Sequence, residues 1–213
     1  MGSFIAREFA AAYGNSLTAV VFMGTSAGIS TAMWKAERTY LNMLKKAKGA
    51  RAKIPSLEKI ATGPYNKKFK PNRTNYDWVT SKEEEVDRFV NDPLCGFSFT
   101  INGYRGLLEL LNRTYLDNTL TAGNPMLPII FMSGCEDSCM LGYKKHIEAV
   151  SKQQEAGYYY VGSKMYAGMR HEILNEIGKE QVYEDILKHI ELFKQMKNCL
   201  LYTSPSPRDG LLS

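Results

Sequence analysis

The chain has 213 residues, of which 44% are apolar and 23% charged, and its formal net charge is +5. This is the composition of an ordinary globular protein, and it excludes intrinsic disorder, a collagen-like repeat and a coiled coil. The apolar runs are far shorter than the roughly 20 residues that a membrane helix needs, and the first residues lack the pattern of a secretory signal peptide. We therefore expect a globular protein that stays in the cytoplasm, where it is made.

The cysteines are Cys95, Cys135, Cys139 and Cys199. They are too few and too irregularly spaced for a disulfide scaffold, which fits a reducing compartment. Cys135 and Cys139 are four residues apart, but no second Cys/His pair with ligand spacing follows them. Two incidental thiols are therefore favoured over a zinc site, and we expect neither a metal nor another cofactor.

The first two elements have a helix pattern and then a strand pattern. Residues Ser3–Tyr13 repeat apolar side chains at three- and four-residue spacing, which predicts a helix with that face buried, and Gly14 ends it. Leu17–Met23 is a mostly apolar run between turn residues, which predicts a strand buried on both faces, as in a parallel sheet. The apolar positions of the helix are Ile5, Phe9, Ala12 and Tyr13.

The pattern changes from about Ile29 to Ala122, where helical periodicity dominates and no convincing strand occurs. The alternation of strands and helices then resumes, so we expect an α/β protein whose sheet is interrupted by a helical insertion. The later elements are expected at Ile129–Ser133 (strand), Tyr143–Ala156 (helix), Tyr158–Tyr166 (strand) and Glu172–Phe193 (helix).

The last segment, 199–213, differs from everything before it. Its prolines and serines between Ser204 and Pro207 cannot continue the preceding helix and offer little apolar surface for a core. The segment also resembles translated sequencing-adaptor sequence. We expect this tail not to belong to the fold.

Positive charge is concentrated between Lys35 and Arg73, where twelve lysines and arginines face two acids, Glu37 and Glu58. A solvated helical face explains such a segment most simply, and peripheral contact with an anionic lipid surface is left open. Aromatic residues are not interleaved with the basic ones in an RNA-binding pattern, so we do not expect nucleic acid as a partner.

Two residues that can carry chemistry follow predicted strands. Asp137 comes just after Ile129–Ser133, and His171 just after Tyr158–Tyr166, at the edge where α/β sheets place their ligands. An acid followed along the chain by a histidine matches the last two members of a Ser-Asp-His triad, in which the acid orients the imidazole. Glu136 is a lesser alternative for the acid.

Two other histidines, His146 and His189, fall on predicted helices among charged neighbours. We expect them to be solvated or partly packed rather than catalytic.

Four segments carry a resemblance to a known family: MGSFIAREFAAAYG, the stretch from Tyr65 to Thr100, PIIFMSG, and GMRHEILNEIGKEQVYEDILKHI. They resemble the bacterial lysophospholipase and monoacylglycerol lipase-like branch of the α/β hydrolases, often labelled serine aminopeptidase-like. The resemblance implies that 1–28 and 123–198 form the C-terminal part of a hydrolase core and 29–122 a helical cap. It further implies Asp137 as the acid and His171 as the base, although the loop after Asp137 departs from the family's Asp-Pro-Val-Gly.

The resemblance places the nucleophile outside the printed sequence. The family's elbow reads G-H-S-M-G, followed by S-F-x-A-R, so Met1 and Gly2 match its last two positions and the serine would precede Met1. The backbone of Met1 would then belong to the oxyanion hole, and Ser3 would be a helix residue. The rival is Ser26 in GTSAG, which satisfies G-x-S-x-G literally.

The resemblance implies a serine hydrolase that cleaves carboxylic esters of small lipids, such as monoglycerides or lysophospholipids, without a cofactor. In this interpretation the printed chain is a truncated piece that is inactive by itself. The alternatives are a peptidase or small-ester hydrolase on the same triad, and a non-catalytic α/β binding module whose basic cap docks on an anionic surface.

Overall fold

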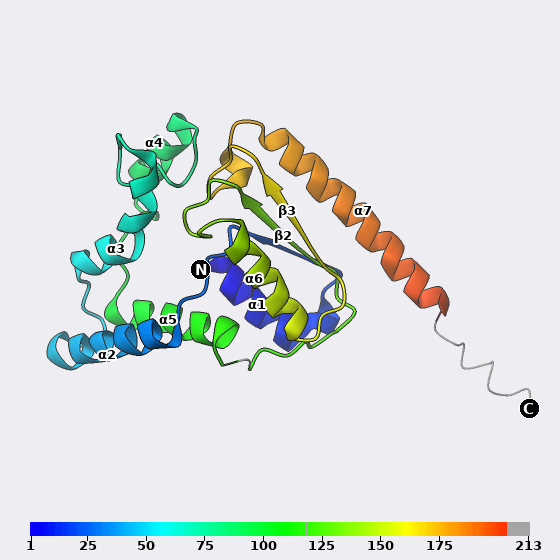
Figure 1. Cartoon of the computed structure of the whole chain (residues 1–213), viewed down its shortest axis with the longest axis horizontal. Helices are drawn as coiled ribbons and strands as arrows, with labels where there is room; N and C mark the ends of the chain where they lie inside the picture. Colours follow the sequence, from blue (N-terminus) through cyan, green and yellow to red (C-terminus); the bar gives the residue numbers. More distant parts are fainter. Residues whose placement is uncertain (118, 204–213) are drawn as a thin grey trace, which may run out of the picture.

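Three parallel strands form the sheet of this protein in the computed structural model, which describes residues 1–117 and 119–203, with side chains up to Met196. The strand order is β1-β2-β3, with Val20 paired to Ile129 and Ile129 to Val161. The carboxyl ends of all three strands therefore meet at one edge of the sheet (Figure 1). The strands are β1 (Val20–Met23), β2 (Ile129–Gly134) and β3 (Val161–Tyr166).

Helices cover both faces of this sheet (Figure 1). Alternate residues of β2 point to opposite faces, so Phe131 packs with Phe22 against α1 and α6, while Met132 packs against α7. All six residues of β2 are buried, as a central strand between two helical layers requires. The layers are formed by α1 (Gly2–Tyr13), the short 3-10 helix η1 (Gly14–Ser16) and α6 (Tyr143–Glu155) on one face, and by η3 (Ile173–Asn175) and α7 (Lys179–Thr203) on the other.

The segment between β1 and β2 forms a helical cap beside the sheet (Figure 1). Ser30 begins its first helix by accepting a hydrogen bond from Met33 N, and Thr100 begins its last by accepting one from Gly103 N. The cap helices pack on a small apolar core of Leu41, Leu57, Ile101 and Leu108. They are α2 (Thr31–Lys48), α3 (Pro55–Thr62), η2 (Gly63–Phe69), α4 (Glu83–Asn91) and α5 (Ile101–Tyr115). The expected α/β class with a helical insertion is confirmed.

The last cap helix, α5, also belongs to the sheet layer. The ring of Tyr115 meets Phe4 of α1 edge to face, with 6.1 Å between the ring centroids. Arg113 forms an ion pair of 2.7 Å with Glu8 of α1. The cap is therefore attached to the core along α5. The expected boundaries of the cap, 29–122, stay a prediction.

The buried face of α1 was predicted wrongly. Ile5, Phe9 and Tyr13 are 52%, 48% and 57% exposed, and Ala12 is exposed too. The face that packs on the sheet and on α5 instead carries Ser3, Phe4, Arg7 and Ala10. Arg7 can lie in this face because its guanidinium donates to Gln153 Oε1 and to the carbonyl oxygen of Ala149, and lies over the Tyr115 ring.

Two further elements differ from their predictions. Only Phe22 of β1 is buried, rather than both faces of that strand, because within the described residues β1 pairs on one edge alone. The last helix begins at Lys179 instead of Glu172, because residues 170–176 form hydrogen bonds to the cap. It continues to Thr203, whereas 204–213 of the predicted tail lie outside the described residues.

His146 is fully buried, which corrects the expectation of a solvated or partly packed side chain. Its ring meets Phe131 edge to face at 6.3 Å, and neither ring nitrogen has a hydrogen-bond partner in the described structure. Burial lowers the pKa of His146, and the charge of Asp137 opposes this only in part. Neutral imidazole is therefore the form that the folded protein accommodates.

Acid should therefore destabilise the protein through His146. The pKa of His146 in the folded protein is below the unfolded value of about 6.5. The contribution of neutral His146 to the free energy of unfolding is therefore complete above that pH and is lost as the pH falls below it. The loss is at most about 1.4 kcal/mol per pH unit for one proton. We expect His146→Leu to flatten the dependence of the unfolding free energy between pH 7 and 5, measured by urea denaturation. Equal slopes for the wild type, His146→Leu and a His189→Leu control would contradict this.

Candidate active site

The structure brings Asp137 and His171 together at the carboxyl edge of the sheet. Nδ1 of His171 lies 3.0 Å from Oδ2 of Asp137, and the other oxygen, Oδ1, accepts a hydrogen bond of 2.8 Å from Cys139 N. The Asp137 side chain is fully buried, whereas that of His171 is 26% exposed. A buried carboxylate therefore fixes one imidazole nitrogen and leaves the other, Nε2, for chemistry.

Glycines at two strand ends allow the histidine to come this close. Gly24, directly after β1, has φ +52°, and a Cβ there would lie 3.0 Å from Cε1 of His171. A Cβ on Gly134, at the end of β2, would lie 2.1 Å from the carbonyl oxygen of Met169, in the loop that carries His171. Any larger residue at Gly134 would displace that loop, because the obstructing atom belongs to the backbone.

A large apolar cavity lies between the cap and this edge of the sheet. Its volume is about 830 Å³, and Asp137 and Cys139 lie in its wall with Ser26. The side chains that give it its apolar character are Ile29, Met33, Leu41, Leu57, Ile60 and Leu108. This size and lining suit a small, mostly apolar ligand.

Trp78 covers one side of the His171 ring. The two ring centroids are 5.2 Å apart and the planes are tilted by 53°. Trp78 comes from the cap segment between η2 and α4, so the cap reaches the proposed base directly. The resemblance implied cap packing for Trp78 and left contact with substrate open, but no pattern in the sequence indicated that His171 is its neighbour.

Ser26 lies in the cavity wall but is not arranged as an elbow nucleophile. Its Oγ donates toward the carbonyl oxygens of Cys139 at 3.3 Å and Ala27 at 3.4 Å, and none of its described hydrogen bonds goes to His171. An elbow serine is strained between a strand and a helix. Here α2 begins only at Thr31, and among the described non-glycine residues Leu141 alone has a positive φ.

The start of α1 lies at the same site. Burial lowers the pKa of the Met1 amino group, and its electrostatic interactions with Cys139 and Asp137 oppose this only in part. The positive end of the α1 dipole lies beside the turn after β1, where Gly24 approaches His171. Ser3 is buried in α1 and donates to Thr25 Oγ1 at 2.8 Å, as a helix residue that packs against the turn after β1.

Asp137, Cys139 and His171 are the described residues that could hold a metal ion, with ligand atoms within 4.8 Å of one another. Both carboxylate oxygens of Asp137, however, already accept hydrogen bonds. Burial raises the pKa of the Cys139 thiol, and the charge of Asp137 raises it further. The thiol therefore stays protonated and is a poor ligand. These donors fit a hydrogen-bonded acid and base better than a metal site.

Comparison with known proteins identifies the family. The family model described as serine aminopeptidase, S33, matches residues 1–178. The chain belongs to this family. A search of curated protein sequences gave no match for this S33 member.

Solved structures show that this S33 member has the α/β hydrolase fold. A thermostable carboxyl esterase from Bacillus coagulans, in complex with glycerol, has a TM-score of 0.74 and 21% identity over 91% of this chain and 61% of the esterase. A lipase in its open form has a TM-score of 0.74 and 20% identity over 92% of this chain and 63% of the lipase. A monoglyceride lipase variant from Saccharomyces cerevisiae, in complex with a substrate analogue, has a TM-score of 0.63 and 15% identity over 90% of this chain and 59% of the lipase. The chain thus spans about three fifths of these proteins.

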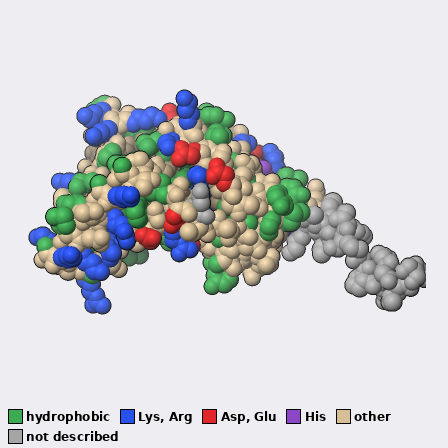
Figure 2. Space-filling model, turned by 60° about the horizontal axis from the view of Figure 1, so that its bottom comes forward, with side chains coloured by type: hydrophobic (Ala, Val, Ile, Leu, Met, Phe, Trp, Pro, Cys, Tyr) green, Lys and Arg blue, Asp and Glu red, His purple; other side chains and the backbone are tan. Residues whose placement is uncertain are grey.

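The remaining expectations concern the outside of the molecule. Lysine and arginine side chains gather at the end formed by the cap, as Figure 2 shows. Contact of this surface with lipid stays a prediction. In the described part of the chain, no helix is long and apolar enough to cross a membrane.

Proposed function

We propose that the protein is a serine hydrolase that cleaves carboxylic esters of small lipids, with His171 as the base and Asp137 as its orienting acid. The observation that carries the proposal is the 3.0 Å contact between Asp137 and His171 at an apolar cavity of about 830 Å³. Membership in the S33 family, whose triad these residues match in chain order, supports it.

In this proposal the nucleophilic serine precedes Met1 in a longer protein. Three facts support that position: α1 begins beside the turn after β1 that approaches His171, Ser26 has no elbow geometry, and the chain spans about 61% of the similar esterase. The serine hydroxyl attacks the ester carbonyl while Nε2 of His171 takes its proton, and the alcohol leaves with that proton. Water then hydrolyses the acyl-enzyme by the same route. The Met1 N–H would donate to the oxyanion.

A peptidase is the second candidate, and Glu37 is the observation that favours it. Glu37 lies in the cavity wall, where its carboxyl could bind the amino group of a peptide. Lys67 and Lys68 line the same cavity and oppose a cationic ligand. The apolar wall therefore favours an ester with an acyl chain.

Substrate class can be tested with a bulky substitution in the cavity. In the protein that includes the residues preceding Met1, Met33→Trp should reduce kcat/KM for p-nitrophenyl decanoate about 10-fold or more and leave the butyrate within about 3-fold, because it shortens the acyl site. Met43→Trp is the matched control, since Met43 lies on the same helix but does not line the cavity. Faster turnover of amino-acid p-nitroanilides than of esters would favour the peptidase instead.

A further inference from the structure

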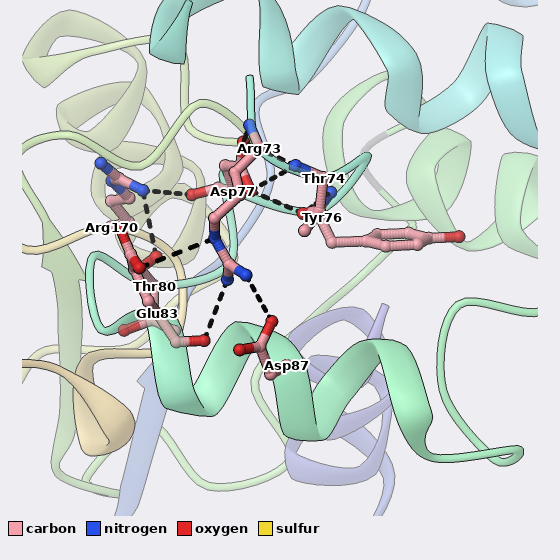
Figure 3. A network of polar contacts seen from close by, with 8 residues as sticks. All are labelled: Arg73, Thr74, Tyr76, Asp77, Thr80, Glu83, Asp87 and Arg170. Atoms are coloured by element: carbon pink, nitrogen blue, oxygen red, sulfur yellow. Dashed lines mark hydrogen bonds and ion pairs between the residues drawn. The ribbon is translucent and has the colours of Figure 1, made fainter. Parts of the chain in front are cut away.

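The loop that carries His171 is fastened to the cap by hydrogen bonds on both sides of the histidine. On one side, Arg170 Nη1 donates to the carbonyl oxygens of Asp77 and Thr80, the latter at 3.0 Å (Figure 3). The guanidinium also lies 4.1 Å from the ring centroid of Phe69. Next to the histidine on the other side, Glu172 N donates to the carbonyl oxygen of Val79 at 2.8 Å.

Glu176 makes the most concentrated contact of this junction. Its side chain is 2% exposed, and Oε1 accepts hydrogen bonds from Ser81 N at 2.9 Å and from Arg170 N at 2.8 Å. Oε2 accepts from Ser81 Oγ and, more weakly, from Ile177 N at 3.3 Å. Within the described side chains, no lysine, arginine or histidine forms an ion pair with Glu176. Its charge is therefore balanced by main-chain N–H groups and a hydroxyl. Because these hydrogen bonds are directional, they hold the Glu176 carboxylate in one position.

The cap segment held in this way has further hydrogen bonds of its own. Asp77 accepts hydrogen bonds from Arg73 N at 2.7 Å and from Thr74 N at 3.0 Å, and Arg73 pairs with Asp87 of α4 (Figure 3). Segment 77–81 also carries Trp78, which covers the His171 ring. The cap and the histidine loop therefore form one packed unit.

We propose that Glu176 and Arg170 are positioning residues, which hold His171 against Asp137 by fastening its loop to cap segment 77–81. The proposal rests on the proposed role of His171 and adds that the base is placed by the cap as well as by its own loop. Removing the Glu176 carboxylate leaves the partly buried N–H groups of Ser81 and Arg170 without these acceptors, so the histidine loop loosens from the cap. Ser81→Ala removes only the hydroxyl donor and should have the same effect in weaker form.

The test is the solvent exchange of the His171 Nδ1–H proton, followed by NMR in the full chain. Its signal, assigned by its loss in His171→Asn, should exchange about 10-fold faster or more in Glu176→Ala, by an intermediate factor in Ser81→Ala, and nearly as in the wild type in Glu176→Gln, which keeps one carbonyl oxygen. Glu180→Gln, an exposed carboxylate at the start of α7, is the matched control.

Wild-type exchange in folded Glu176→Ala and Ser81→Ala would overturn the proposal, even if both variants melt at lower temperature. If Glu176→Ala does not fold, Ser81→Ala alone decides. The readout needs no turnover, so it is separate from the proposed function. A protein that hydrolyses no ester but shows the expected exchange rates would refute the hydrolase and keep the positioning role.

Discussion

His171→Ala is expected to lower kcat for p-nitrophenyl butyrate by about 10⁴-fold or more in the protein that includes the residues preceding Met1. Without the imidazole, the proposed enzyme loses the group that takes the proton of the nucleophile and returns one to the leaving alcohol. KM should change little, because Asp137 and the apolar wall, which does not include His171, form the cavity. Initial rates, normalised by the amount of folded protein, measure the effect.

Two variants control for a general loss of structure. His189→Ala removes a half-buried histidine of α7 that stacks on Phe193, and it should keep kcat within about 3-fold. Asp137→Asn keeps the side-chain shape and should cost on the order of 10³- to 10⁴-fold, because it no longer stabilises the imidazolium. Turnover by folded His171→Ala at the wild-type rate would exclude His171 as the base.

The position of the nucleophile gives the second large effect. A fluorophosphonate probe, which bonds to activated serines, is expected to label the protein that includes the residues preceding Met1 and to leave residues 1–213 unlabelled. Ser26→Ala should not change labelling of the longer protein, because Ser26 Oγ is directed to main-chain carbonyl oxygens rather than to His171. Intact-mass measurement of the adduct provides the readout.

The outcomes separate the two positions of the nucleophile from each other and from a non-catalytic protein. Labelling of residues 1–213 that disappears in Ser26→Ala would place the nucleophile at GTSAG and contradict the proposal. Labelling of neither protein, together with no turnover, would favour the non-catalytic binding module. Labelling of the longer protein alone, lost in His171→Ala, is the expected result.

The positions of Asp137 and His171 could be predicted because each follows a strand. Parallel strands end at the same edge of a sheet, so two residues 34 apart in sequence become neighbours once the strands are recognised. Glu176 could not be found in this way. Its partner Ser81 lies 95 residues away in the cap, and periodicity carries no information about which loop meets which.

The errors in the fold have related causes. The spacing of Ile5, Phe9 and Tyr13 correctly indicated a helix but not its buried side, because α1 has a second face that includes Arg7. That face is buried because Gln153 and the Ala149 carbonyl oxygen accept from the guanidinium, and these partners belong to α6. His146 was misjudged for the same reason: charged neighbours in sequence do not face the same way on a helix.

The pairing of Val20 with Ile129 has a consequence for how the cap can vary. These two residues enclose a loop of roughly a hundred residues, and the entropy of closing a loop grows only with the logarithm of its length. Adding or removing a turn of cap helix therefore changes the cost of pairing β1 with β2 by a small fraction of a kcal/mol. The sheet therefore tolerates caps of many sizes. Segment 77–81 itself does not tolerate a change of length, because it must still reach the histidine loop.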